Sequence, residues 1–196
     1  MQRRGSPTRA TGLLAYPAAA WHRALFKAPL LLWRLGFGPW LGHALLVLTY
    51  TGRRSGLPRR AVIEYRELGE RKYVICAFGQ RADWLRSIQA DPCVTIQTAD
   101  GAEAALARRV TDDEELLAVY ALLQQRIPFL LERYLRARGV PNTPEGVLQH
   151  RDRIDIVAFE PTDAPAPPPL AADLIWVWGM AAVIAGLRWL RRRRPA

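Results

Sequence analysis

The stretch from Ala44 to Thr98 constrains the fold most, because short apolar runs alternate in it with sharp polar breaks. The runs cover residues 44–51, 61–65, 72–78 and 93–97, and the breaks are rich in Gly, Pro and charged residues. Apolar runs of this length, separated in this way, are typical of β-strands joined by turns. The stretch therefore predicts a β-sheet built from hairpins.

Two further segments complete the predicted sheet. Residues 104–110 follow the run at 93–97 across Asp100–Gly101, a dipeptide that favours a tight hairpin turn. Residues 153–159 alternate between apolar and other residues, as a strand with one buried face does. We expect an α+β fold, a small β-barrel of about six strands with helical insertions.

The helical insertions are marked by capping residues. Asp83 is the expected N-cap of a short helix that ends before Asp91–Pro92. Thr111 is the expected N-cap of a longer helix, which Pro128 bends or restarts and Gly139 ends.

Charge is distributed unevenly along the 196 residues, whose net charge is +10. Residues 1–63 contain ten Lys or Arg and no acidic residue, and residues 188–196 contain five Arg and no acidic residue. A basic front favours anionic partners such as phosphate-bearing small molecules or anionic lipid. Aromatic-rich RNA motifs and a helix-turn-helix pattern are missing from the sequence, so we expect no nucleic-acid partner.

The ends of the chain differ from the middle. Residues 12–43 mix Trp, Leu and Phe at helical spacing with Arg and Lys, which predicts a basic amphipathic helix that packs on the barrel, contacts a membrane surface, or does both. Residues 161–169 are a Pro/Ala linker. The expected organisation is a disordered basic N-terminus (1–11), the amphipathic helical region (12–43), the barrel domain (44–160), the linker (161–169) and an apolar, Arg-terminated tail (170–196).

The apolar tail contains 14 uncharged residues, from Leu174 to Leu187, which make about 21 Å of helix. A full membrane crossing needs about 20 residues. The Arg191–Arg194 cluster favours the cytoplasmic side. We expect a helix lying at or dipping into the inner leaflet of the cell membrane, with a true span as the alternative.

The turn after the first apolar run has the composition of a phosphate site. Gly52 and Gly56 allow a tight turn with exposed N–H groups, and Ser55 adds a hydroxyl donor. Four arginines within eight residues, Arg53, Arg54, Arg59 and Arg60, have no acidic neighbour. Arginine forms bidentate contacts with phosphate. The sequence therefore favours a phosphate cradle over a merely solvated hairpin tip.

The order of these motifs resembles the deazaflavin-dependent nitroreductase family. The matching pattern is a strand, Thr51-Gly-Arg-Arg-Ser-Gly-Leu-Pro-Arg59, two strands, a Gly-containing loop, Asp83-Trp84 opening a helix, and Ala90-Asp-Pro92 before another strand. The resemblance implies a split β-barrel oxidoreductase that uses coenzyme F420, a deazaflavin hydride carrier with a phosphodiester and an oligoglutamate tail, rather than FMN. The cofactor-binding residues that it implies are Arg53, Arg54, Ser55, Gly56, Arg59, Arg60, Ala77, Phe78, Gly79, Gln80, Arg81 and Trp84.

The chain departs from the family pattern in the loop and helix that follow. Members often have two glycines where this chain has Gly79-Gln80, and an Asn-Leu pair where it has Ser87-Ile88. The departures bear on the choice of substrate more than on cofactor binding. They also leave open a non-catalytic barrel that binds FMN, haem or a lipid.

The implied reaction needs few catalytic side chains, because the cofactor carries the hydride chemistry. The acceptor is expected to be a hydrophobic small molecule such as a quinone or nitro compound. Tyr120 and Tyr134 are candidate proton donors, although core packing explains both and water would also serve. A homodimer is compatible with the sequence.

Metal chemistry is not expected. The histidines are scattered, and Cys76 and Cys93 stand far apart in predicted strands, where they suit buried packing.

Overall fold

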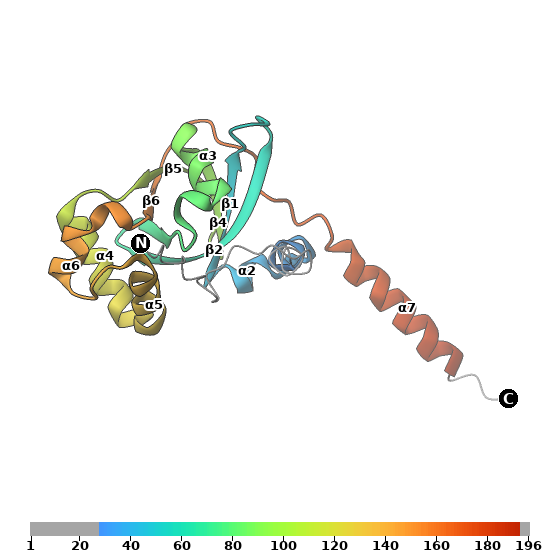
Figure 1. Ribbon diagram of the computed structural model, residues 1–196. Helices are drawn as coiled ribbons and strands as arrows, with labels where there is room; N and C mark the ends of the chain where they lie inside the picture. Colours follow the sequence, from blue (N-terminus) through green and yellow to red (C-terminus); the bar gives the residue numbers. More distant parts are fainter. Residues whose placement is uncertain (1–27, 193–196) are drawn as a thin grey trace, which may run out of the picture.

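Six antiparallel strands close into a barrel in the computed structural model, which describes residues 28–192 (Figure 1). Their order around the barrel is β1-β2-β3-β6-β5-β4. The strands are β1 (Leu45–Thr51), β2 (Pro58–Leu68), β3 (Arg71–Ile75), β4 (Cys93–Thr98), β5 (Gly101–Arg109) and β6 (Ile156–Pro161). This architecture confirms the predicted α+β split barrel of six strands with helical insertions.

Two strand predictions were wrong at one end. The third strand was expected to reach Phe78, but β3 ends at Ile75 and the chain turns away toward a short 3₁₀ turn, η2. The last strand was expected to begin at Arg153, but η3 occupies 151–153 and β6 begins at Ile156. In both cases the sequence pattern extends beyond the residues that pair, because β3 and β6 pair only over Lys72–Ile75 and Ile156–Phe159.

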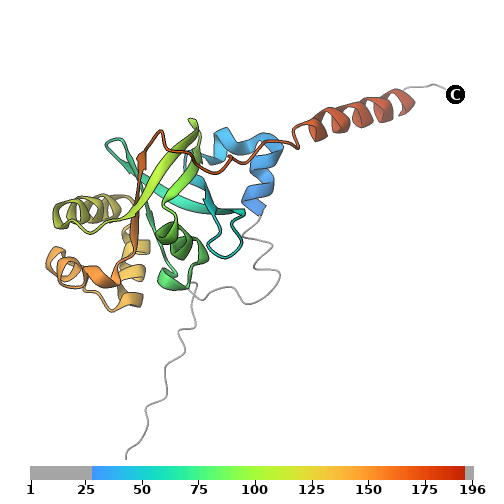
Figure 2. The same cartoon turned by 90° about the horizontal axis from the view of Figure 1, so that it is seen from above.

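The helices lie outside the barrel (Figures 1 and 2). They are η1 (Trp33–Phe37), α2 (Gly38–Leu41), η2 (Gly79–Arg81), α3 (Asp83–Ala90), α4 (Asp113–Arg126), α5 (Pro128–Arg138), α6 (Pro144–Gln149), η3 (Arg151–Arg153) and α7 (Trp176–Arg192). Pro128 restarts the chain as α5, and Gly139 ends α5 in the left-handed conformation, as predicted. Helix α6 was not predicted.

Both predicted N-caps were wrong by one residue. Asp112, not Thr111, caps α4 by accepting a hydrogen bond from the Glu115 N–H at 2.8 Å. Ala82 occupies the N-cap position of α3, and Asp83 is its first helical residue. The Asp83 carboxylate is therefore free to pair with arginines.

Two apolar cores hold the fold together. One fills the barrel and contains Leu46, Leu48, Ile96 and Phe159, all nearly inaccessible to solvent. The other lies between the outer face of β3 and β6 and the helices α4, α5 and α6. Alternation along the strands sends neighbouring residues into different cores, so Tyr73 packs outside and Val74 inside.

The barrel is open beside the first half of β2. Residues 65–68 of β2 pair with β3, whereas residues 58–64 pair with β1 alone among the described strands. The cause is the early end of β3 at Ile75. The chain that follows, residues 76–84, lies across this opening instead of extending the sheet.

A charged cluster around Glu115 anchors α4 to the strands. The Glu115 carboxylate accepts two hydrogen bonds from Arg108, at 2.7 and 2.8 Å, and one from the Tyr73 hydroxyl at 2.8 Å. The Arg108 contact holds the pKa of Glu115 below its usual value. The ionised form of Glu115 is therefore stabilised in the folded state relative to the unfolded chain.

We expect Glu115→Gln to lower the free energy of unfolding at pH 7 by about 1–3 kcal/mol, because Arg108 and the buried Tyr73 lose a charged acceptor. The wild-type advantage should shrink as pH falls from about 5 to 3, since the unfolded carboxyl protonates near 4.3 and the folded one at lower pH. Urea unfolding at several pH values checks this, with the exposed neighbour substituted Glu114→Gln as the control. An equal loss at pH 7 and pH 3 would contradict it.

The described part of the N-terminal helical region, residues 28–41, lies at the barrel end formed by the β4–β5 hairpin. Gly42 follows it in such close contact that an added Cβ would meet the Ala99 nitrogen at 2.1 Å. The Tyr65 hydroxyl donates a hydrogen bond to the Gly42 carbonyl at 2.8 Å. The predicted disordered segment 1–11 and the rest of the region to residue 27 lie outside the described residues.

The segment after β6, residues 162–175, is termed the C-terminal strap and runs along the outside of β4. The Gln97 amide exchanges hydrogen bonds with the backbone N–H and C=O of Leu170, at 2.6 and 3.1 Å. The Thr95 hydroxyl donates to the Pro167 carbonyl. The Pro/Ala stretch is thus seated on the barrel in this structure.

The base of α7 contacts the N-terminal helical region. Arg34 and Asp173 form a bidentate ion pair at 2.7 and 2.8 Å, and the Trp178 indole donates to the Leu35 carbonyl at 2.9 Å. Beyond this contact α7 projects away from the barrel (Figures 1 and 2). Within residues 28–192, no helix is both long enough and apolar enough to span a bilayer.

Candidate functional site

The turn between β1 and β2, together with the first two residues of β2 (residues 52–59), is termed the arginine turn. Gly56 adopts a φ of +64° and donates to the Gly52 carbonyl at 2.8 Å, which closes the turn tightly. Ser55 lies against Gly52, whose added Cβ would meet its hydroxyl oxygen at 2.8 Å. The predicted need for glycine at these two positions therefore has a steric basis.

A cavity of about 260 Å³ lies under the arginine turn. It is lined by Tyr50, Gly52, Arg53, Arg54, Ser55, Arg59, Asp83 and Ser87. Four predicted cofactor residues are thus brought together: Arg53, Arg54, Ser55 and Arg59. Gly56 and Arg60 do not line this cavity, and strand alternation places Arg60 on the face of β2 opposite to Arg59.

Asp83 and Ser87 of α3 form the wall opposite the arginines, and sequence reasoning missed their part in this site. Arg53 donates to the Asp83 carboxylate at 3.1 Å, and its backbone N–H donates to the Ser87 hydroxyl at 3.4 Å. The Arg53 contact holds the pKa of Asp83 below its usual value. The i,i+4 spacing of Asp83 and Ser87 on one helix face was the available signal.

Residues 77–84 lie across the barrel opening and carry the other six predicted cofactor residues. Phe78 and Trp84 pack on the barrel core, while Gln80 and Arg81 are exposed. Gly79 is buried with a φ of +53°. Gln80 keeps an ordinary negative φ, so this turn is made with a single glycine where family members often have two.

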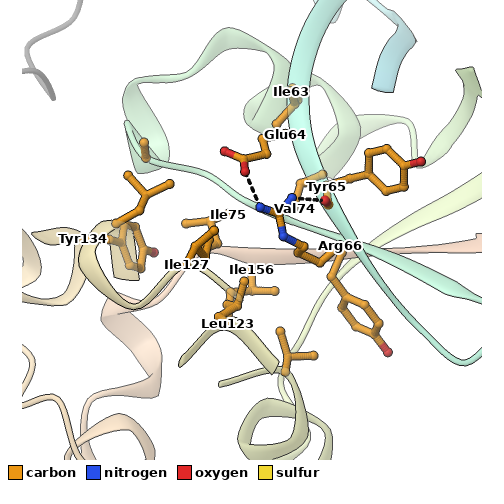
Figure 3. Close-up of a pocket in the computed structure, with 14 residues that line it drawn as sticks. Ile63, Glu64, Tyr65, Arg66, Val74, Ile75, Leu123, Ile127, Tyr134 and Ile156 are labelled. Atoms are coloured by element: carbon orange, nitrogen blue, oxygen red, sulfur yellow. Dashed lines mark hydrogen bonds and ion pairs between the residues drawn. The ribbon is translucent and has the colours of Figure 1, made fainter. Parts of the chain in front are cut away.

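An apolar pocket of about 180 Å³ lies beside Ala77, at the start of this loop (Figure 3). It is formed between β2 and β3 on one side and α4 and α5 on the other. Its lining includes Ile63, Ile75, Ala77, Ile127, Leu130 and Tyr134. Arg66 and Glu64 pair with each other at its edge, and the Arg66 guanidinium also donates to the Tyr65 carbonyl at 2.6 Å.

The two candidate proton donors lie in different surroundings. Tyr134 lines the apolar pocket with 3% of its surface exposed, and its hydroxyl oxygen accepts a hydrogen bond from the Asp155 N–H at 2.8 Å. Burial raises the pKa of Tyr134 to about 12. The Tyr120 hydroxyl donates to the Asn142 side chain at 3.0 Å and does not line the pocket.

Cysteine and metal chemistry find no support in the part of the chain that the structure describes. Cys76 and Cys93 are free thiols, and burial raises the pKa of Cys76 to about 12, which disfavours the reactive thiolate. Residues 28–192 contain no group of three or more His, Cys, Asp or Glu arranged to hold a metal ion.

The arrangement fits an extended anionic cofactor with a flat ring. The arginine turn offers cations and a hydroxyl for phosphate, and the apolar pocket lies at the other end of the same stretch of β2. Arg59 and Ile63 stand four residues apart on β2, or about 13 Å along the strand. The cationic cavity and the apolar pocket therefore lie at two positions along the same strand, β2.

Comparison with known proteins agrees with this arrangement. The sequence model of the F420H2-dependent quinone reductase family matches residues 36–134, which include the arginine turn, the loop 77–84 and Tyr134. A search of curated proteins finds no match.

Several solved structures are similar to the chain. An F420-H2 dependent reductase (FDR-A) is 21% identical over 60% of this chain and 94% of its own, with a TM-score of 0.46. The haem storage protein HutZ from Vibrio cholerae is 15% identical over 76% of this chain and 98% of its own, with a TM-score of 0.43. A putative pyridoxamine 5'-phosphate oxidase from Listeria innocua is 12% identical over 68% and 91%, with a TM-score of 0.42.

Proposed function

Because the chain belongs to the F420H2-dependent quinone reductase family, we propose that it reduces a hydrophobic quinone-like acceptor at the cytoplasmic face of the cell membrane. Family membership makes the chain an F420-dependent oxidoreductase, with coenzyme F420 as its cofactor. The choice of acceptor and the place in the cell are our proposal. The observation that carries it is that a cationic cavity and an apolar pocket lie along the same strand, β2.

In the proposed site the arginine turn binds the anionic part of the cofactor. Arg53, Arg54 and Arg59 supply positive charge, and the Ser55 hydroxyl supplies a further donor. Arg53 is already paired with Asp83, so part of its charge is neutralised before any ligand enters. The affinity of the cradle is therefore set by a competition between the Asp83 carboxylate and the incoming anion.

The loop 77–84 and the apolar pocket orient the two reactants. Bound deazaflavin supplies the hydride, and the protein aligns donor and acceptor and keeps water out. Ala77 belongs to both the loop and the pocket, so the two binding regions meet there. The apolar lining suits the ring of a quinone better than a charged substrate.

We assign the accompanying proton to water. The Tyr134 hydroxyl oxygen already accepts a hydrogen bond from a buried N–H, and the residue is only 3% exposed, so solvent has little access to reprotonate it. Tyr120 lies outside the pocket lining. Neither tyrosine is needed for hydride transfer in this scheme.

Exposed apolar side chains support the membrane part of the proposal. Trp40 is 75% exposed on α2, and Trp176, Met180 and Val183 are each more than half exposed on α7. The Arg34–Asp173 pair joins these two helical segments at one end of the molecule. The arginines from 188 onward would add attraction to anionic lipid. The homodimer remains a prediction.

Titration of the full-length protein with coenzyme F420, followed by fluorescence with FMN as control, tests the proposal. We expect F420 binding well above FMN binding, and oxidation of the reduced cofactor by a soluble naphthoquinone. A prenylated quinone should be reduced faster in anionic than in zwitterionic vesicles. Preference for FMN, or binding without turnover, would favour the non-catalytic alternative. Equal rates in both vesicle types would remove the membrane part alone.

A further inference from the structure

An ion pair lies beneath the loop that crosses the barrel opening. Arg138, the last residue of α5, donates to the Asp155 carboxylate at 3.0 Å, and Asp155 is only 4% exposed. The same guanidinium donates to the Cys76 carbonyl at 3.2 Å and to the Arg153 carbonyl at 3.1 Å. The Arg138 side chain thus connects α5 with two other segments, one at Cys76 and one at residues 153–155.

Gly79 of the loop rests directly on this pair. A Cβ built on Gly79 would meet the Arg138 Nη2 atom at 2.5 Å and the Asp155 Oδ2 atom at 2.7 Å. At these distances the end of the Arg138 or Asp155 side chain would have to shift, and the φ of +53° at Gly79 strains any residue that carries a Cβ. The loop backbone therefore lies directly against the two charged groups, and a side chain at this position would disturb both the pair and the loop.

The backbone of Asp155 joins the loop to the apolar pocket. Its carbonyl accepts a hydrogen bond from the Cys76 N–H at 2.8 Å, and its N–H donates to the Tyr134 hydroxyl at 2.8 Å. The Arg138 guanidinium also lies 5.3 Å from the centre of the Tyr134 ring. One residue therefore links the start of the loop to a wall of the pocket.

A buried ion pair is a poor device for stability alone, because apolar residues of similar size often do as well or better. It is well suited to fixing one geometry, since its donors and acceptors fit together in a single arrangement. Here the fixed geometry is that of residues 76–79 relative to Tyr134.

We propose that Arg138 and Asp155 are positioning residues that set the distance between the cofactor loop and the acceptor pocket. The inference rests on the proposed function, in which this loop borders the deazaflavin ring and Tyr134 borders the acceptor. Neither side chain touches the reactants in this scheme. Their effect on hydride transfer is exerted through the loop backbone.

The test compares Arg138→Lys and Asp155→Asn with the unaltered protein, using full-length chains. Both variants should lower kcat roughly 10- to 100-fold, because a displacement of about 1 Å between reactants has an effect of that size. The dissociation constant of coenzyme F420 should change far less, since the arginine turn is untouched. The emission of the bound cofactor should shift, because its ring would lie in a changed environment.

Arg136→Ala is the matched control, because Arg136 lies on the same helix and pairs with Glu132 on the exposed side. It should leave kcat, affinity and emission unchanged. Thermal melting identifies variants that fail to fold. In that event Arg138→Gln decides the case, since it removes the charge that pairs with Asp155 while keeping a polar side chain at this position.

The outcomes separate the two proposals. If the unaltered protein neither binds nor oxidises reduced F420, the proposed function fails and this inference fails with it. If the unaltered protein turns over while both folded variants keep kcat within twofold and show no spectral shift, only the positioning role is overturned. Activity that falls only in proportion to the unfolded fraction would also overturn it, because that result describes a purely structural pair.

Discussion

The double variant Arg53→Ala/Arg54→Ala is expected to bind coenzyme F420 about a hundredfold more weakly than the unaltered protein. Each charge-assisted contact to an anion contributes about 1.5–3 kcal/mol. Two contacts would total about 3–6 kcal/mol, where each 1.4 kcal/mol is tenfold in affinity. The cofactor must first displace Asp83 from Arg53, which it contacts at 3.1 Å. The expected loss therefore lies toward the lower end of the range of about 3–6 kcal/mol.

Fluorescence titration at two salt concentrations measures this loss. Affinity of the unaltered protein should fall as salt increases, and the double variant should respond less, because two cations of the cavity are gone. Arg60→Ala is the matched control, since Arg60 lies next to Arg59 but on the opposite strand face and does not line the cavity. A large loss with Arg60→Ala, or none in the double variant, would contradict the assignment of the cradle.

Leu130→Trp is expected to lower kcat/KM for the quinone by about 10- to 100-fold while leaving F420 affinity unchanged. Leu130 lines the apolar pocket and is 41% exposed, so a larger ring there narrows the entrance without overpacking the core. Adding or removing an apolar group in a substrate pocket changes the free energy of transition-state binding by about 1–3 kcal/mol.

Phe129→Trp provides the control for this prediction. Phe129 is the preceding residue of α5, is 76% exposed and does not line the pocket. Steady-state kinetics with a soluble naphthoquinone should show normal kcat/KM for Phe129→Trp. If both variants behave alike, or if Leu130→Trp retains full activity, the acceptor binds elsewhere.

Local features of the sequence were sufficient to predict the barrel. The alternating runs and the Gly-rich breaks gave the strands, and Pro128 and Gly139 marked helix ends because each acts on its own backbone. The four cradle residues that were found are close in sequence and belong to one turn. Such features need no knowledge of distant partners.

The rest of the site depends on distant contacts, which one sequence does not reveal. The apolar pocket brings together Ile63 of β2, Ile75 of β3 and Ile127 between α4 and α5. In the sequence each of them looks like an ordinary core residue. Asp83 was interpreted as a cap because its partner Arg53 lies 30 positions away. In the sequence Asp155 fits an alternating strand pattern, and this pattern does not reveal that its side chain pairs with Arg138.

The order of strands in the barrel has a consequence for synthesis on the ribosome. The last strand, β6, lies between β3 and β5, and Lys72 pairs with Phe159 across most of the domain. A nascent chain that has emerged only to Arg109 therefore carries five strands with two unpaired edges, and such edges are prone to aggregation. The helices α4 to α6 emerge before those edges can close, so the nascent chain remains vulnerable until Pro161 has left the exit tunnel.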